Sequence, residues 1–226
     1  MVVIFDWDGT LIDSAGKIIA CMQQAARDAA LAPPTDDQVR NIIGLGLDLA
    51  IARLYPDASQ RQRDEVREHY SRNFIAADQT PCAFFPGVTD GLASLQERGA
   101  QLAVATGKSR KGLSRVLENL GMEAFFAATR CADETASKPD PLMLHELCEE
   151  FGIRPNEAIM VGDTEYDLEM AQRIAMPSVG VSYGAHAVER LTRWQPLQVI
   201  DAFAELDDVL TRHCGFRPCE PSEATF

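Results

Sequence analysis

The sequence has no long hydrophobic run and comparatively few basic residues. Its first apolar run, residues 2–5, is too short for a membrane span or a signal-peptide core, and no basic segment precedes it. The 226 residues include 21 lysines and arginines against 34 aspartates and glutamates, a net charge of −13. This excess of negative charge disfavours sequence-independent binding to nucleic acid or to an anionic membrane. We therefore expect a cytoplasmic protein whose partners are neither nucleic acid nor membrane.

Cysteine pairs, repeats and low-complexity tracts are also missing. The six cysteines are irregularly spaced and none belongs to a C-x-x-C pair. A chain of this length can bury a hydrophobic core without disulfide bonds, so we expect reduced thiols.

Short apolar runs alternate with longer stretches of helical period. This alternation is typical of an α/β fold, a Rossmann-like parallel sheet covered by helices on both faces. The expected strands are residues 2–6, 101–106, 125–129, 158–162 and 178–182, with a weaker one at 197–200.

One segment interrupts the alternation. Residues 14–84 contain no convincing strand and read as helices divided by proline and glycine turns. We expect a catalytic core formed by residues 1–13 and 85–212, with a small α-helical domain (14–84) inserted after the first strand. Residues 213–226 lack periodicity and are expected to form a loosely ordered tail.

Polar residues end the expected strands. Asp6, Thr106 and Asp163 each stand at such an end, and Lys138 precedes a helix. In an open parallel sheet, ligands bind beyond the carboxyl ends of the strands. Clustered carboxylates call for a cation, and Mg²⁺, which prefers oxygen ligands and often bridges to a phosphate, is the natural choice. Asp6 and Asp163 are the best ligands, while Thr106, Lys138 and nearby backbone amides would bind a phosphate.

These residues form four ordered motifs: 6-DWDGT-10, Thr106, 138-KP-139 and 162-GDTEYD-167. In order and spacing they resemble the motifs of the haloacid dehalogenase superfamily of phosphatases. The inserted segment resembles the helical C1-type cap of that family. The segments 104-VATGK-108 and 42-IIGLG-46 further resemble its phosphoglycolate phosphatase-like branch. The resemblance covers residues 1 to about 210 and depends on all four motifs together.

The resemblance implies a role for each motif residue. Asp6 would be the nucleophile that takes the phosphoryl group as an aspartyl phosphate, and Asp8 the general acid and base. Mg²⁺ would be held by Asp6, by the backbone carbonyl of Asp8 and by Asp163. Thr106, the Gly107 amide and Lys138 would bind the phosphoryl oxygens. Asp167 would support either the water shell of the metal or the orientation of Lys138.

Two positions depart from the family pattern. Gly107 stands where relatives often have asparagine, which keeps the backbone amide but removes a side-chain contact. Ala175 stands where the family tends to place a helix-ending glycine, a less comfortable residue for a left-handed turn.

In the inserted helices, Gly44 and Leu47 are expected to contact the leaving group and set specificity. The loop 44-GLGL-47 carries no charge, so a carboxylated substrate would need Arg40, Arg53 or Lys17 from elsewhere.

Several functions stay open at this point. The main expectation is a Mg²⁺-dependent phosphatase acting on a small phosphorylated metabolite, such as phosphoglycolate, a sugar phosphate or a nucleoside monophosphate. A phosphomutase uses the same aspartyl phosphate and differs only in the acceptor. A phospho-acceptor receiver module fits less well, because it would not carry an insert after its first strand. Either a monomer or a homodimer is compatible with the sequence.

Overall fold

The computed structural model describes residues 1–77 and 82–215. Its centre is a six-stranded, fully parallel sheet with the strand order β3-β2-β1-β4-β5-β6. The strands are β1 (Val2–Phe5), β2 (Gln101–Thr106), β3 (Ala128–Cys131), β4 (Ala158–Gly162), β5 (Ser178–Val181) and β6 (Gln198–Ile200). The α/β class predicted from the sequence is confirmed.

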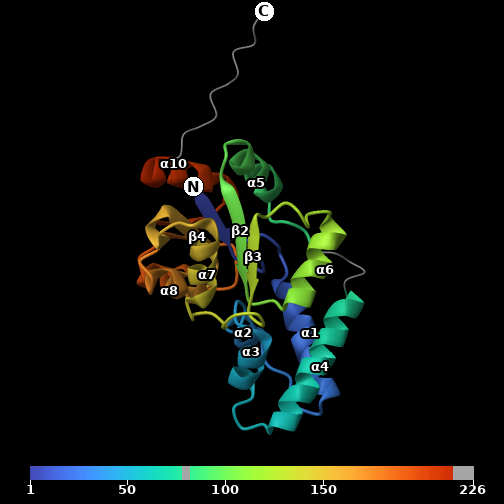
Figure 1. The fold of residues 1–226 in the computed structure, drawn as a ribbon. Helices are drawn as coiled ribbons and strands as arrows, with labels where there is room; N and C mark the ends of the chain where they lie inside the picture. Colours follow the sequence, from blue (N-terminus) through green and yellow to red (C-terminus); the bar gives the residue numbers. More distant parts are fainter. Residues whose placement is uncertain (78–81, 216–226) are drawn as a thin grey trace, which may run out of the picture.

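Helices cover both faces of the sheet, because successive side chains of a strand point to opposite sides. Val3 and Phe5 of β1 belong to one hydrophobic cluster, and Val2 and Ile4 to another. The first cluster is closed by α5 (Val88–Glu97), α6 (Arg110–Leu120) and α10 (Leu206–Cys214). The second is closed by α7 (Leu142–Phe151) and α8 (Glu165–Gln172) (Figure 1). A short helix, α9 (Val188–Leu191), lies between β5 and β6 along the chain.

Strand β1 lies in the middle of the sheet, between β2 and β4. Val2 pairs with Gln101 on one side and with Ala158 on the other, so the three strands run in step. Their carboxyl ends therefore meet at one edge. This is the edge at which the strand order reverses, where α/β sheets bind their ligands.

The third strand begins later than the sequence indicates. We expected it at 125–129, but β3 runs from Ala128 to Cys131. Phe125 instead lies in a turn whose amide donates to the Met122 carbonyl. Phe126 is buried with its ring centroid 6.0 Å from that of Trp7. The two phenylalanines pack against the core from this turn, so their apolar character does not indicate a strand. Strand pairing with β2 starts after them, at Ala128.

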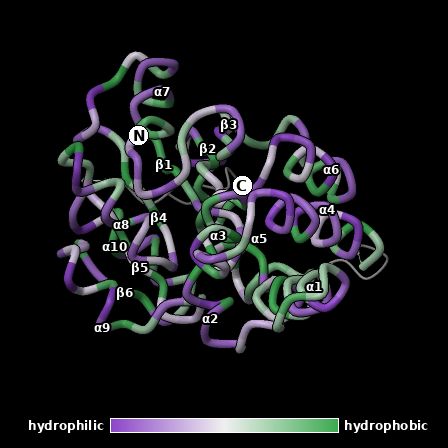
Figure 2. Tube along the Cα trace, turned by 90° about the horizontal axis from the view of Figure 1, so that it is seen from below, coloured by the Kyte–Doolittle hydropathy of each residue, from purple (hydrophilic) through white to green (hydrophobic). Residues whose placement is uncertain are grey.

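The segment after β1 folds into helices α1 (Ala15–Asp28), α2 (Asp36–Arg40), α3 (Leu47–Leu54) and α4 (Gln60–Ala76). We call these the inserted helices. Thr35 and Ser59 begin α2 and α4 with reciprocal capping boxes. The inserted helices share a separate hydrophobic cluster and lie beyond the carboxyl ends of the strands (Figure 1). In Figure 2 the tube of α4 is largely hydrophilic, whereas β1 and β2 are largely hydrophobic.

Tyr166 connects the inserted helices to the sheet domain. It belongs to α8 but is buried in the cluster of the inserted helices, and its hydroxyl donates to the Asn41 carbonyl at 2.7 Å. A second connection is the Gly46 amide, which donates to Ser137 Oγ at 2.8 Å. These contacts hold the inserted helices over the edge of the sheet.

The C-terminal part of the described chain ends with α10, which extends to Cys214 and is followed by Gly215 at φ 63°. Residues 216–226, most of the predicted tail, lie outside the described ranges.

Cys131 and Cys148 are buried thiols, and burial raises the pKa of Cys131 to about 12. Within the described ranges, no helix combines the length and apolar character needed to cross a bilayer.

Candidate active site

The edge of the sheet brings the predicted site residues together. Asp6 follows β1, Thr106 ends β2, and Asp163 follows β4, and these three strands are neighbours. All three residues are at most 1% exposed. Lys138 and Asp167 reach the same place from the loop before α7 and from the first turn of α8.

Lys138 lies at the centre of this cluster. Its Nζ is 2.7 Å from Asp6 Oδ1 and 2.6 Å from Asp167 Oδ1, and all three side chains are buried. Burial alone would lower the pKa of Lys138, but the charges of Asp167 and Asp6 outweigh it and raise that pKa above its ordinary value. Lys138 is therefore a permanent ammonium that balances only part of the negative charge around it.

The carboxylates Asp6, Asp163 and Asp167 have oxygens within 4.8 Å of one another. Burial raises the pKa of Asp6 well above its usual range, opposed by Lys138 and reinforced by Asp167 and Asp163. Burial, with the charge of Asp167, raises the pKa of Asp163 to about 7. Three acidic groups surround one ammonium, so the cluster is short of positive charge at neutral pH.

A divalent cation fits this deficit. Asp6 Oδ2 is buried and has no hydrogen-bond partner among the described residues. The donors are hard carboxylate oxygens, which suit Mg²⁺. Asp6 and Asp163 could hold the ion, because the donors that contact the Asp163 oxygens are neutral. Asp167 is less available, since one of its oxygens already faces an ammonium. Its Oδ1 pairs with Lys138, and its Oδ2 accepts from the amide and the hydroxyl of Thr164.

Asp163 is fixed by two donors and two glycines. Thr10 Oγ1 donates to its Oδ1 at 2.8 Å, and the Ala185 amide donates to its Oδ2 at 2.7 Å. A Cβ on Gly9 or Gly184 would lie 2.2 Å from an Asp163 side-chain atom, so both positions require glycine. The sequence motif alone predicts no role for Thr10, and its hydrogen bond in the structure orients Asp163.

Asp8 lies beside this cluster and is held from both sides. Ser14 Oγ donates to its Oδ1 at 2.7 Å, and Lys108 Nζ lies 2.9 Å from its Oδ2. The Lys108 ammonium also lies 4.8 Å from the ring centroid of Phe74 in α4. Sequence reasoning missed Ser14 and Lys108 as site residues. The only available signal was that Lys108 stands two residues after Thr106, the end of a strand.

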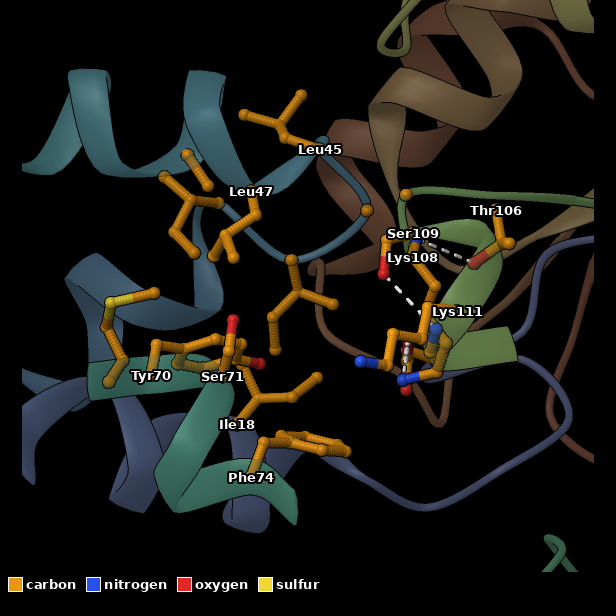
Figure 3. Close-up of a pocket in the computed structure, with 18 of the residues that line it drawn as sticks. Ile18, Leu45, Leu47, Tyr70, Ser71, Phe74, Thr106, Lys108, Ser109 and Lys111 are labelled. Atoms are coloured by element: carbon orange, nitrogen blue, oxygen red, sulfur yellow. Dashed lines mark hydrogen bonds and ion pairs between the residues drawn. The ribbon is translucent and has the colours of Figure 1, made fainter. Parts of the chain in front are cut away.

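A cavity of about 360 Å³ opens over Asp6 and Asp8. Thr106, Gly107 and Lys108 form its floor, together with the first turns of α6. The inserted helices supply the facing wall (Figure 3). Residues of that wall are Ile18, Met22, Ile42, Ile43, Gly44, Leu45, Leu47, Ala50, Tyr70, Ser71, Phe74 and Ile75. The predicted cap residues Gly44 and Leu47 therefore both border the cavity.

Gly107 has a steric explanation. A Cβ at this position would lie 2.6 Å from the carbonyl oxygens of Gly44 and Leu45. The asparagine expected from the family pattern would not fit under the 44–47 loop in this arrangement. Gly44 is itself at φ +94°, and a Cβ there would approach Thr164 Oγ1 to 2.9 Å. The loop thus lies directly on the sheet edge.

The cations suggested for binding a carboxylate do not line this cavity. Arg53 donates to the Tyr166 hydroxyl at 2.9 Å, Lys17 lies 4.5 Å from the Phe74 ring centroid, and Arg40 is exposed. Lys111 and Arg115 of α6 line it instead. They were missed because the sequence does not show which face of α6 turns toward the inserted helices.

A parallel sheet with a carboxylate pair after β1, a hydroxyl at the end of β2, a buried lysine and carboxylates after β4 defines a site for phosphoryl transfer. The comparisons agree, because residues 3–181 match the family model described as haloacid dehalogenase-like hydrolase. The chain belongs to this family.

Curated relatives resemble the chain over nearly its whole length. It is 35% identical over 211 residues to a protein of Dickeya dadantii (strain 3937) named probable phosphatase IndB, with 90% of each chain covered. It is 32% identical over 212 residues to the phosphoglycolate phosphatase of Agrobacterium fabrum, covering 92% of this chain and 91% of that one. A crystal structure of a predicted phosphoglycolate phosphatase from Haemophilus somnus 129pt superposes with a TM-score of 0.84 at 24% identity, covering 92% and 96%. That likeness supports the fold.

Proposed function

We propose that this protein is a Mg²⁺-dependent phosphatase that hydrolyses a small phosphorylated metabolite through an aspartyl phosphate on Asp6. One observation carries the proposal. Asp6 has one carboxylate oxygen fixed by Lys138, while the other is buried without a hydrogen-bond partner among the described residues, and the residue borders the cavity. A carboxylate oriented in this way is ready to attack phosphorus.

In the first step a carboxylate oxygen of Asp6 forms a bond to phosphorus and the ester oxygen leaves. Asp8, bordering the same cavity, gives its proton to that oxygen. Ser14 and Lys108 position the Asp8 side chain, which carries the proton before this step, and stabilise the carboxylate that the transfer leaves. In the second step Asp8 takes a proton from water, which attacks the aspartyl phosphate and restores Asp6 with release of inorganic phosphate.

The phosphoryl oxygens are bound by Thr106, by the Gly107 amide and by Lys138. Mg²⁺ would be held by Asp6, Asp163 and the Asp8 backbone carbonyl, and the chemistry it supplies when bound is neutralisation of charge between carboxylate and phosphate. Asp167 positions Lys138, because its Oδ1 lies 2.6 Å from Nζ.

The inserted helices act as a cap domain over a core formed by residues 1–13 and 85–212. The cap excludes bulk water and contacts the leaving group through Gly44 and Leu47, which border the cavity.

The test is phosphate release from a panel of phosphate monoesters with Mg²⁺, followed by mass spectrometry of the products and of the trapped enzyme. We expect inorganic phosphate as the product and a phosphoryl adduct on Asp6. An adduct on another residue would contradict the assignment. Transfer of the phosphoryl group to a sugar hydroxyl instead of water would identify a phosphomutase.

A further inference from the structure

The two walls of the cavity differ in character. The wall formed by the inserted helices is almost entirely apolar, with Ile18, Ile43, Leu47 and Phe74 among its members. Figure 3 shows Ile18, Leu47 and Phe74 on one side of the cavity and Lys108 and Lys111 on the other. Polar side chains of the apolar wall are limited to Tyr70 and Ser71 within the described residues. A small, fully polar leaving group would leave this wall in contact with water.

The size of the cavity supports a larger leaving group. Its volume is about 360 Å³. Pockets of about 300 Å³ and above are the ones that enclose drug-sized ligands, mainly through apolar contact. The phosphoryl group occupies only the floor, near Asp6 and Thr106, so most of the apolar wall faces the remainder of the substrate.

The opposite wall is cationic in a protein that is otherwise acidic. Lys108, just before α6, and Lys111 and Arg115 within it all line the cavity, although the chain carries a net charge of −13. The carboxylates that line it are Asp6 and Asp8, which pair with Lys138 and Lys108. Lys111 has no ion-pair partner within the described ranges. Positive charge is therefore left over beyond the phosphate subsite.

From these two walls we infer that the leaving group is amphiphilic: it has an apolar body at least as large as a six-membered ring and a second anionic group. The apolar body lies against the inserted helices, and the anionic group lies against Lys111 on α6. This inference rests on the proposed phosphatase function and specifies its substrate class. It differs from a two-carbon acid, which would supply the charge without the apolar body.

Four esters of primary alcohols separate the two features, since their leaving oxygens have similar basicity. They are ethyl phosphate, phosphoglycolate, benzyl phosphate and 4-carboxybenzyl phosphate. We expect kcat/KM for benzyl phosphate to exceed that for ethyl phosphate by about tenfold or more, because burying a ring-sized apolar surface is worth that factor. The 4-carboxybenzyl ester should be cleaved faster still, and phosphoglycolate more slowly than either benzyl ester.

Variants assign each preference to its wall. Leu47→Ser should reduce the benzyl-to-ethyl ratio several-fold, whereas Leu49→Ser, on the same helix but 36% exposed and outside the cavity lining, should leave it unchanged. Lys111→Gln should reduce the ratio of 4-carboxybenzyl to benzyl phosphate and leave the benzyl-to-ethyl ratio as it was.

The outcomes distinguish the inference from the function beneath it. Equal kcat/KM for ethyl and benzyl phosphate would overturn the apolar subsite, and equal values for benzyl and 4-carboxybenzyl phosphate would overturn the anionic one. In both cases phosphatase activity would stand. Absence of phosphate release from all four esters with Mg²⁺ present would overturn the proposed function and the inference together.

Discussion

The sheet edge and the inserted helices contribute to the same cavity in opposite ways. At the sheet edge, charged groups hold one another: Lys138 contacts Asp6 and Asp167, and Asp163 accepts from Thr10 and Ala185. The inserted helices present mostly apolar side chains to the same space. Under the proposed function, this difference predicts that reactivity depends on a few fixed contacts in the sheet domain, and that substrate choice depends on shape and apolar surface across the cavity.

The largest effect should come from the sheet edge alone. Asp6→Asn should lower kcat by about five to six orders of magnitude, the effect of losing a covalent nucleophile in other enzymes. The fold should survive, because the amide is nearly isosteric. Phosphate release and circular dichroism measure the two properties. Asp13→Asn, an exposed change in the same segment, is the matched control and should keep full activity. Turnover of Asp6→Asn within tenfold of the parent would remove Asp6 from the mechanism.

The Mg²⁺ requirement should distinguish Asp163, a proposed ligand of the ion, from Asp167, which contacts Lys138. A chelator should abolish activity and Mg²⁺ restore it. Asp163→Asn should raise the Mg²⁺ concentration for half-maximal activity by about tenfold or more. Asp167→Asn should instead lower kcat with a smaller change in that concentration, because Asp167 contacts Lys138. Full activity in the presence of chelator would contradict the magnesium site.

A single added methyl group at Gly107 should disturb the contact between the sheet edge and the 44–47 loop. Gly107→Ala places a methyl group 2.6 Å from the Gly44 and Leu45 carbonyl oxygens, so the 44–47 loop must move. We expect a loss of about 1–3 kcal/mol in the free energy of unfolding, typical of overpacking, and a higher KM. Gly16→Ala, in the first turn of α1 with no atom within 4 Å of the added Cβ, should not lower the free energy of unfolding and should raise it slightly. Denaturant titration and steady-state kinetics report the two effects, and equal stability of both variants would show that the loop is not closely seated.

His186, which lies beside Tyr166, should make the free energy of unfolding depend on pH. Its Nδ1 accepts from the Glu165 amide, and its ring meets Tyr166 edge-on at 5.2 Å. Burial, with the charge of Arg190, lowers the pKa of His186 from 6.5 to about 4, and the charges of Glu165 and Asp167 oppose this. The unfolded chain therefore binds a proton that the folded chain does not. The contribution of the neutral His186 to the free energy of unfolding is fully present above pH 6.5, and it is lost as the pH falls from 6.5 toward 4.

At pH 5 the loss should be about 2 kcal/mol relative to pH 7. Asp163, whose pKa is raised to about 7, acts in the opposite direction. The contribution of its protonated form to the free energy of unfolding is lost as the pH rises from about 4 to 7. The contribution of His186 is therefore isolated by comparing the parent with His186→Gln at each pH without metal. The difference in their unfolding free energies should change by about 2 kcal/mol between pH 7 and pH 5. A difference that stays constant with pH would show that His186 titrates normally.

The sheet domain was more predictable than the inserted helices. Asp6, Thr106 and Asp163 follow apolar strands, and parallel strands bring such residues to one edge whatever the details of packing. The position of Phe74 beside Lys108 could not be predicted in this way. It lies in a helix of mostly polar sequence, and its partner is far along the chain. The late start of β3 has a similar cause, because Phe125 and Phe126 look the same in a strand and in a buried turn.

Ala175 shows where a sequence departure has a physical cost. It ends the turn after α8 at φ 56°, and Ala30 ends the turn after α1 at φ 55°, both left-handed conformations. The left-handed conformation costs an alanine about 1–2 kcal/mol in the folded state. Replacement by glycine removes this strain, but glycine also makes the unfolded chain more flexible, which offsets part of the stabilisation.

The smallest expected effect compares the two regions directly through these alanines. Ala175→Gly in the sheet domain and Ala30→Gly in the inserted helices should each raise the free energy of unfolding by about 0.5 kcal/mol, or Tm by about 1–2 °C. Neither residue lines the cavity, so kcat/KM should not change. Gly121→Ala, at φ 65°, is the reverse control and should lower Tm. Calorimetry showing one transition that both substitutions shift equally means that the inserted helices unfold together with the sheet. If Ala30→Gly shifts only an earlier transition, the inserted helices unfold independently, and the contacts of Gly46 and Tyr166 are too weak to join the two regions.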